Sequence, residues 1–143
     1  MLPMNAEIAP DALYESRLTA LTRLSQGKVR DIYAVDAEHL LIVTTDRLSA
    51  FDVVLPDPIP GKGEVLTRLS NFWFARTAGI VRNHLAGLKL EDVIADPVER
   101  ATVASRSMLV RRLRPLPIEA VVQGDVVVVR PGERIAVDGE VIA

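Results

Sequence analysis

The spacing of the hydrophobic residues changes at Gly61-Lys62-Gly63, and this change limits the chain to a mixed architecture. Before it, charged and apolar residues alternate over 28–35, and 39–45 is rich in β-branched residues, so both segments are predicted to be strands. After it, apolar side chains recur at helical spacing over 64–85, which predicts a long helix that stops at Gly87. The expected fold class is α+β, a mainly antiparallel sheet with packed helices.

Further elements are predicted on both sides of this change. Asp11 is expected to cap a helix over 12–24, and 51–55 is expected to form a third strand. The short gap at 36–38 favours an antiparallel hairpin between the first two strands. Strands are also predicted over 108–113 and 118–122, and the residues beyond Gly124 indicate a C-terminal β-hairpin. The aromatic residues of the long helix are interpreted as core: Phe72, Trp73 and Phe74.

Composition excludes several classes of function. Seventeen basic and nineteen acidic residues give a net charge of -2, which leaves no basic footprint for nucleic acid. The absence of cysteine removes disulfides and thiolate chemistry, and neither His39 nor His84 has a second ligand at metal spacing, so no metal site is predicted. No signal peptide or membrane span is recognised, so a cytoplasmic protein without a membrane partner is expected.

Gly27, Lys28 and Arg30 are the first candidate ligand-binding residues. A glycine in a β-turn followed by basic side chains can bring backbone N–H groups and two cations to a polyphosphate. Lys28 and Arg30 are expected to share one face of a strand, because side chains two apart point the same way. The alternative is a surface hairpin with solvated charges.

A second cluster of polar residues follows the second strand. Asp46, Arg47, Ser49 and Asp52 lie where that strand ends, a position at which sheets often present functional groups. In the alternative interpretation, Asp46 and Ser49 only bond local amides in a capped turn.

Arginine and glutamate side chains also lie in the later predicted strands. Arg111 and Arg112 fall on opposite faces of their strand, so at least one is expected to be exposed. Glu119 lies in an apolar strand, where it either faces solvent, pairs with a basic side chain or positions substrate.

Taken together and in this order, these segments resemble successive landmarks of the SAICAR synthase family over about 13–122. The quoted landmarks are Gly27-Lys28-Val29-Arg30-Asp31-Ile32-Tyr33, Thr45-Asp46-Arg47-Leu48-Ser49-Ala50-Phe51-Asp52, Pro58-Ile59-Pro60-Gly61-Lys62-Gly63, Ser70-Asn71-Phe72-Trp73-Phe74, Asn83-His84-Leu85, Arg106-Ser107-Met108 and Pro117-Ile118-Glu119-Ala120-Val121-Val122.

The resemblance implies an ATP- and Mg²⁺-dependent ligation of aspartate to carboxyaminoimidazole ribotide in purine biosynthesis. By position, it assigns ATP binding to Gly27, Lys28, Arg30, Arg112 and Leu113, with the backbone of the last two meeting adenine. It assigns substrate binding to Ser49, Ala50, Asp52 and Glu119. No catalytic residue is assigned.

The resemblance is expected to stop near Gln123, where the family has a substrate-binding arginine. The metal-binding carboxylates and catalytic lysine of the family's C-terminal half are absent. Residues 124–142 instead resemble part of the actuator domain of heavy-metal P-type ATPases, so a chimera is expected, with a lobe over 1–123 and a β-rich tail over 124–143.

Three functions follow from this interpretation. The chain is a ligase by family, although inactive when truncated, or a residual nucleotide-binding module, or a non-catalytic scaffold completed by the tail. Exposed strands also predict homo-oligomers.

Overall fold

The computed structural model describes residues 12–51 and 53–114. Several predictions fall outside these ranges: the Asp11 cap, the strand over 118–122, the tail beyond Gly124, and the site residues Asp52 and Glu119.

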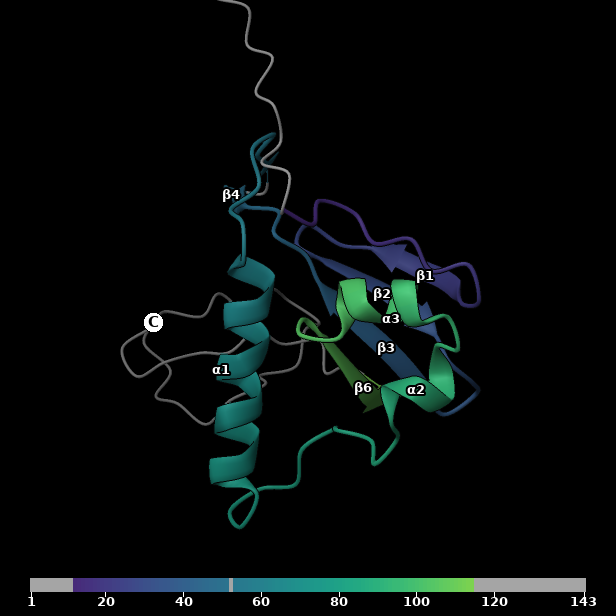
Figure 1. The fold of residues 1–143 in the computed structure, drawn as a ribbon. Helices are drawn as coiled ribbons and strands as arrows, with labels where there is room; N and C mark the ends of the chain where they lie inside the picture. The colour runs from purple at the N-terminus through teal and green to yellow at the C-terminus, as the bar shows by residue number, and fades with distance from the viewer. Residues whose placement is uncertain (1–11, 52, 115–143) are drawn as a thin grey trace, which may run out of the picture. The chain divides into compact units, whose positions relative to one another are not determined.

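A four-stranded antiparallel sheet forms the centre of the described chain (Figure 1). Its strands are β1 (Thr22–Gln26), β2 (Arg30–Ala34), β3 (His39–Thr44) and β6 (Ser107–Arg111), in the order β1-β2-β3-β6. The predicted strands near 28–35, 39–45 and 108–113 are thus confirmed, with shorter bounds. The predicted hairpin is confirmed as well, because β2 and β3 pair antiparallel across the short turn between them.

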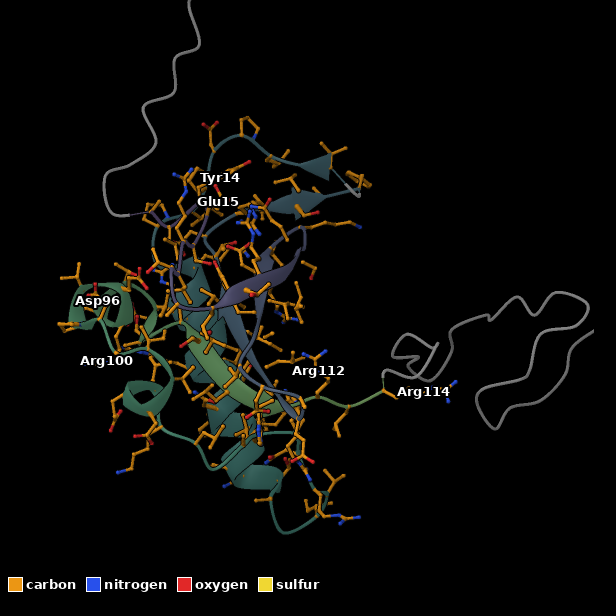
Figure 2. All side chains as sticks on the ribbon, turned by 90° about the vertical axis from the view of Figure 1, so that its right-hand side faces the viewer. Tyr14, Glu15, Asp96, Arg100, Arg112 and Arg114 are labelled. Atoms are coloured by element: carbon orange, nitrogen blue, oxygen red, sulfur yellow. The ribbon has the colours of Figure 1, made fainter. Side chains whose placement is uncertain are left out.

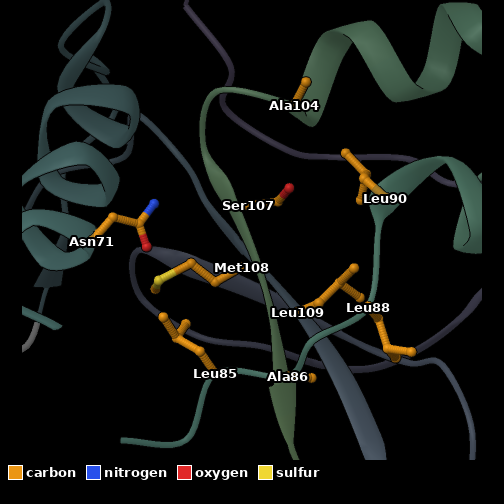
Figure 3. A pocket seen from close by; sticks show the side chains of 9 residues that line it. All are labelled: Asn71, Leu85, Ala86, Leu88, Leu90, Ala104, Ser107, Met108 and Leu109. Atoms are coloured by element: carbon orange, nitrogen blue, oxygen red, sulfur yellow. The ribbon is translucent and has the colours of Figure 1, made fainter. Parts of the chain in front are cut away.

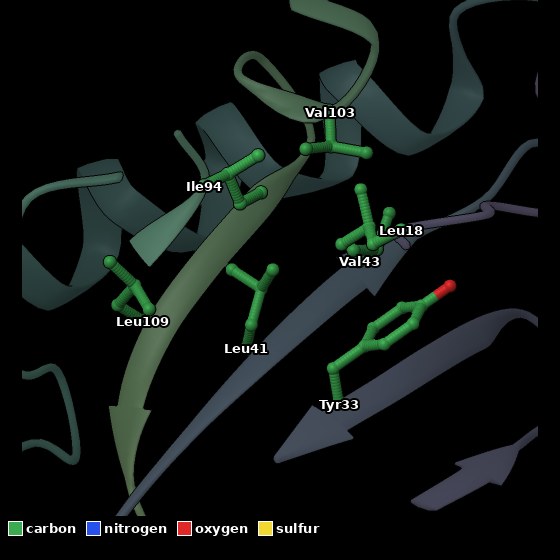
Figure 4. Close-up of a cluster of buried hydrophobic side chains, with 7 residues drawn as sticks. All are labelled: Leu18, Tyr33, Leu41, Val43, Ile94, Val103 and Leu109. Atoms are coloured by element: carbon green, nitrogen blue, oxygen red, sulfur yellow. The ribbon is translucent and has the colours of Figure 1, made fainter. Parts of the chain in front are cut away.

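One face of the sheet carries the hydrophobic core. Tyr33, Leu41, Val43 and Leu109 are buried on this face, because alternate side chains of a strand point the same way. Leu18, Ile94 and Val103 pack against them (Figure 4). Ile94 and Val103 come from the region of two short helices that were not predicted, α2 (Leu90–Val93) and α3 (Pro97–Val103).

The helix predicted over 12–24 is wrong, because residues 12–21 are irregular and β1 begins at Thr22. The backbone N–H of Leu13 donates to the Asp46 carboxylate at 2.8 Å, and that of Ser16 donates to Asp31 at 2.8 Å. These distant carboxylates satisfy donors that a helix would otherwise bond internally.

The long helix is shorter than predicted. α1 covers Lys62–Thr77 and does not continue to 85. Beyond it, the carbonyl of His84 accepts from the Arg111 N–H, and the Ala86 N–H donates to Leu109, so this segment runs beside the edge of β6. A helix continuing through 85 could not make these contacts.

The exposed side of α1 corrects a second prediction. Phe72 and Trp73 are 56% and 53% exposed, so their assignment to the core is wrong. Gly63 and Thr67 are the buried residues of the helix, and Phe72 lies on the opposite side of the helical wheel from them. We call the exposed apolar residues the outer face of α1, and its members are Val65, Leu66, Leu69, Phe72 and Trp73.

The strand predicted over 51–55 is confirmed only in part, at Val53–Val54. Residues Ser49–Ala50 (β4) and Val53–Val54 (β5) pair with each other in a separate two-stranded hairpin. Phe51 lies at its tip with φ of 48°, a left-handed conformation that is rare for a bulky residue and ends any continuous strand there.

Candidate functional site

The glycine turn predicted at residues 27–30 is present between β1 and β2. The Gly27 N–H donates to the Arg30 carbonyl at 2.7 Å, which closes the turn. Lys28 lies in the turn rather than in a strand, so the expectation that Lys28 and Arg30 share a strand face is wrong. Both side chains are exposed at this end of the sheet.

Arg47 holds this turn from the buried side. Its Nη2 donates to the Gly27 carbonyl at 2.8 Å, and its Nε donates to the Lys28 carbonyl at 3.1 Å. Nη2 also lies 2.8 Å from Oδ1 of Asp31, and both side chains are almost completely buried. Because the charge is paired and the donors are bonded, this guanidinium is tolerated inside the lobe.

Asp46 connects three separate segments. Its carboxylate accepts from the backbone N–H groups of Leu13 and Gly63, each at 2.8 Å. Nη1 of Arg106 lies 2.8 Å from Oδ2, an ion pair whose N–H is not aligned as a hydrogen bond. The alternative in which Asp46 caps a local turn is therefore wrong for this residue, since these bonds reach 17 and 33 residues away.

The balance of forces on Asp46 favours the charged form. Burial raises the pKa of this carboxyl, but the N–H of Gly63, the Arg106 guanidinium and the N–H of Leu13 together outweigh burial and leave the pKa below 3.8. We call the connected group the buried polar cluster, and its members are Ser16, Asp31, Asp46, Arg47 and Arg106.

Lys62 joins the same region and was not among the residues predicted from the sequence. Its Nζ donates to the carbonyl of Arg47 at 3.0 Å. Burial lowers the pKa of Lys62, and the nearby charges of Arg30 and Arg47 add to this effect, whereas Asp46 opposes it. The flanking glycines have backbone roles: Gly61 has φ of 76°, and a Cβ on Gly63 would lie 2.2 Å from the Thr44 carbonyl. The sequence signal that could have identified Lys62 is a basic residue between two glycines whose positions in the backbone require glycine.

Ser49 and Ala50, predicted to bind substrate, form β4 and are partly buried. They follow Arg47 by two and three residues, so they are attached directly to the buried polar cluster. The structure thereby brings the turn at 27–30 and the β4–β5 hairpin into one region, with Arg47 bonded to the turn. Phe51 at the hairpin tip is fully exposed, and sequence reasoning gave it no role.

Arg112 and Leu113 lie at the opposite end of the sheet. The Arg112 N–H donates to the Glu38 carbonyl at 2.6 Å, in the turn between β2 and β3. Figure 2 shows Arg112 well away from Tyr14, whose carbonyl accepts from Arg47. Arg111 and Arg112 are both exposed, which agrees with the prediction that at least one would be. Arg112 and Leu113 are not brought together with Lys28 and Arg30.

Within 12–51 and 53–114, no group of three or more histidine or carboxylate side chains is placed to hold a metal ion. Asp31 and Asp46 are the buried carboxylates there, and both already pair with arginines. His39 contacts Asp36 at 3.0 Å. His84 has its pKa lowered by burial and by the charges of Arg111 and Arg30. In the same part of the chain, no helix combines the length and apolarity needed to cross a bilayer.

A pocket of about 230 Å³ opens between α1, the segment after it and β6 (Figure 3). Its lining carries no charged side chain, so it offers nothing that would hold a phosphate. A shallower hollow of about 410 Å³ lies around Glu15 and Arg23. Neither pocket includes a predicted site residue. The lining of the first is Asn71, Leu85, Ala86, Leu88, Leu90, Ala104, Ser107, Met108 and Leu109.

Known proteins match most of this chain. The model of the SAICAR synthetase family matches residues 23–128. A phosphoribosylaminoimidazole-succinocarboxamide synthase from Methylococcus capsulatus is 62% identical over 116 residues, which are 81% of this chain and 39% of the relative. Another with the same name, from Nitrosomonas europaea, is 53% identical over 117 residues, 82% of this chain and 39% of the relative.

Solved structures agree with these relatives. A SAICAR synthase from Saccharomyces cerevisiae, complexed with SAICAR, is similar with a TM-score of 0.65 and 41% identity over 71% of this chain and 37% of that one. A second structure, titled SAICAR synthase, has a TM-score of 0.68 and 40% identity over 74% of this chain and 39% of that one. The chain thus spans about two fifths of the length of the proteins that it matches.

Proposed function

The chain belongs to the SAICAR synthetase family, and on that premise we propose that it forms the nucleotide-binding lobe of a phosphoribosylaminoimidazole-succinocarboxamide synthase. Such a ligase joins aspartate to carboxyaminoimidazole ribotide at the expense of ATP. The observation that carries the proposal is the contact of Arg47 with the turn at 27–30, two residues before the β4–β5 hairpin. This contact supports a site in which phosphates and ribotide meet.

The proposed nucleotide lies along the strands, with its two ends at the two ends of the sheet. Its phosphates meet Gly27, Lys28 and Arg30, and adenine meets the backbone near Arg112 and Leu113. The length of β3 sets the separation of these ends, about 17 Å at roughly 3.3 Å per residue. Because the Arg112 N–H is already bonded to Glu38, adenine recognition falls to the remaining backbone groups there.

The proposed ribotide contacts are Ser49 and Ala50 on β4, with Asp52 and Glu119 outside the described residues. We add Lys62, whose ammonium is fixed to the Arg47 carbonyl immediately before this hairpin. Its position supports a third cation beside Lys28 and Arg30, which would neutralise phosphate charge and orient the reacting carboxylate. Mg²⁺, when bound, supplies further neutralisation of phosphate charge. The described residues offer no ligand set for it, so its protein ligands are proposed to lie outside them.

We also propose that the outer face of α1 is covered by the remaining three fifths of the family fold. Large apolar side chains project opposite the packed side of this helix. Trp73 is the single tryptophan of the chain, so its fluorescence reports directly on this surface. Adding the C-terminal portion of the Methylococcus capsulatus relative is expected to shift Trp73 emission to the blue. Unchanged emission despite binding would contradict this proposal.

Further proposals concern the ends and the setting of the chain. They are a family lobe over 1–123, a β-rich tail over 124–143 resembling a P-type ATPase actuator segment, and Gln123 in place of a substrate-binding arginine. The family match extends through residue 128, so it includes the first residues of the proposed tail. We further propose cytoplasmic localisation and self-association through exposed strands. A non-catalytic scaffold is the alternative function.

Calorimetric titration with MgATP, together with a coupled assay of ligase turnover, tests the main proposal. We expect the native chain to bind MgATP without turnover, and Lys28→Ala to weaken binding about tenfold, as loss of a charge-assisted phosphate contact does. Lys89→Ala removes another exposed lysine, at the start of α2, and is the matched control that should bind normally. Absence of MgATP binding would leave only the scaffold, and turnover would show that the chain is catalytic alone.

A further inference from the structure

Three consecutive carbonyl groups of the turn at 27–30 are bonded from the same buried side. Arg47 donates to the carbonyls of Gly27 and Lys28 at 2.8 and 3.1 Å. Thr45 donates to the carbonyl of Val29 twice, from its backbone N–H at 3.0 Å and from its hydroxyl at 2.9 Å. The negative ends of three successive peptides therefore point toward residues 45 and 47.

The opposite ends of those peptides must point the other way. No cis peptide bond occurs among the described residues, and in a trans peptide the N–H is directed opposite to the C=O. The N–H groups of Lys28, Val29 and Arg30 are thus directed away from Arg47. Successive N–H groups that converge on one side of a turn form an anion-binding concavity.

Arg47 suits this task better than another cation would. Its planar guanidinium reaches two adjacent carbonyls and the Asp31 carboxylate at once, which a single ammonium group cannot do with the same geometry. The side chain is 3% exposed and its charge is neutralised by Asp31, so it does not itself face an anion.

We propose that Arg47, assisted by Thr45, is a positioning residue that orients the N–H groups of the turn toward a bound phosphate chain. The inference rests on the proposed nucleotide role of this turn and adds the residue that builds its anion-binding side. Because Ser49 and Ala50 follow in the same segment, Arg47 also couples the orientation of the turn to the position of the β4–β5 hairpin.

The test compares Arg47→Lys with Arg106→Lys in the whole chain. Arg106 is a matched control, since it is 8% exposed and lies 2.8 Å from a buried carboxylate, but the carboxylate that it pairs with is Asp46 rather than Asp31 beside the turn. Affinity for inorganic triphosphate is measured by calorimetry, and the amide resonances of residues 28–30 are followed by NMR. Arg47→Lys is expected to lower affinity about tenfold and to shift those amides, whereas Arg106→Lys lowers the melting temperature with affinity within about twofold of native.

Thr45→Val is a second test substitution, which preserves the side-chain volume and the hydrogen bond from the backbone N–H of residue 45. It removes one of the two bonds to the Val29 carbonyl and is expected to lower triphosphate affinity about threefold. If Arg47→Lys does not fold, the triphosphate affinity of Thr45→Val tests the inference instead.

Two results would overturn the inference, and they are distinguishable. If the native chain binds no triphosphate, the proposed nucleotide role fails and the inference fails with it. If the native chain binds but Arg47→Lys and Thr45→Val match Arg106→Lys in affinity and in the amides of 28–30, the turn is a phosphate site that Arg47 does not position.

Discussion

The buried polar cluster and the outer face of α1 belong to one lobe but distribute polarity in opposite ways. The cluster places two ion pairs, Asp31–Arg47 and Asp46–Arg106, almost fully out of solvent. The outer face leaves Leu69, Phe72 and Trp73 more than half exposed. Buried charge is costly unless it is paired, and exposed apolar surface usually marks a contact.

The difference distinguishes the part of the lobe that is stabilised by its own internal contacts from the surface that is available for contact with a partner. The cluster joins the segment before β1, the turn at 27–30, the end of β3 and the start of α1 through bonds that are all internal. The outer face has no comparable set of contacts within the described residues. The comparison therefore predicts that mutations in the cluster change folding, whereas mutations on the outer face change association.

The largest effect is expected from Asp46→Ala. This change leaves the buried Arg106 guanidinium without its ion-pair partner and the N–H groups of Leu13 and Gly63 without their carboxylate acceptor. The free energy of unfolding should fall by about 3–5 kcal/mol, measured by urea denaturation. Asp57→Ala, at an exposed aspartate, should change it by less than about 0.5 kcal/mol. Similar losses in both variants would mean that the cluster does not hold the lobe together.

A somewhat smaller loss is expected from Gly63→Ala. The added methyl would lie 2.2 Å from the Thr44 carbonyl, so α1 must move away from β3, at a cost of about 1–3 kcal/mol in urea denaturation. Gly79→Ala is the matched control, because a methyl group added there would meet no neighbouring atom within 4 Å. Equal stability of the two variants would contradict the close approach of α1 to β3.

Acid should weaken the cluster less than removal of its carboxylate does. The pKa of Asp46 is lowered in the folded state, so its stabilising contribution is complete above about pH 3.8 and is lost as the pH falls through the lower folded-state pKa. Denaturation curves across this range should show a steeper acid loss for the native chain than for Asp46→Asn. Parallel losses would assign the acid sensitivity to other groups.

The smallest effect on folding is expected from Phe72→Gln combined with Trp73→Gln. Since both side chains are more than half exposed, the free energy of unfolding should change by less than about 0.5 kcal/mol. Binding of the C-terminal portion of a relative, measured by sedimentation, should nevertheless be lost. A strongly destabilised double variant would place these residues in the folding core, as their helical spacing in the sequence predicted.

Sequence periodicity predicted β2, β3 and β6 because one face of each strand is buried, which produces alternation. It failed over 12–24, where the backbone donors are bonded by Asp31 and Asp46 from distant parts of the chain. Helix α3 was missed although its start is marked by Asp96, which caps the helix, and by Pro97 in its first turn.

The candidate site was predictable only in part. The glycine and the basic residues of the turn at 27–30 were found from their types and order. The roles of Arg47 and Lys62 depend on contacts between segments 15 to 20 residues apart, and the only local signal for either was the pair of glycines that flank Lys62. Helical spacing likewise predicted the apolar stripe of α1, but the spacing alone does not indicate which structural element packs against that stripe.

Titration of the native chain with MgATP, followed residue by residue by amide NMR, tests the central claim most directly. A nucleotide lying along the strands should perturb the amides of Lys28, Val29 and Arg30 and, at the far end of the sheet, that of Leu113. Perturbations confined to the apolar pocket beside β6, or to one end of the sheet, would contradict the proposed binding mode.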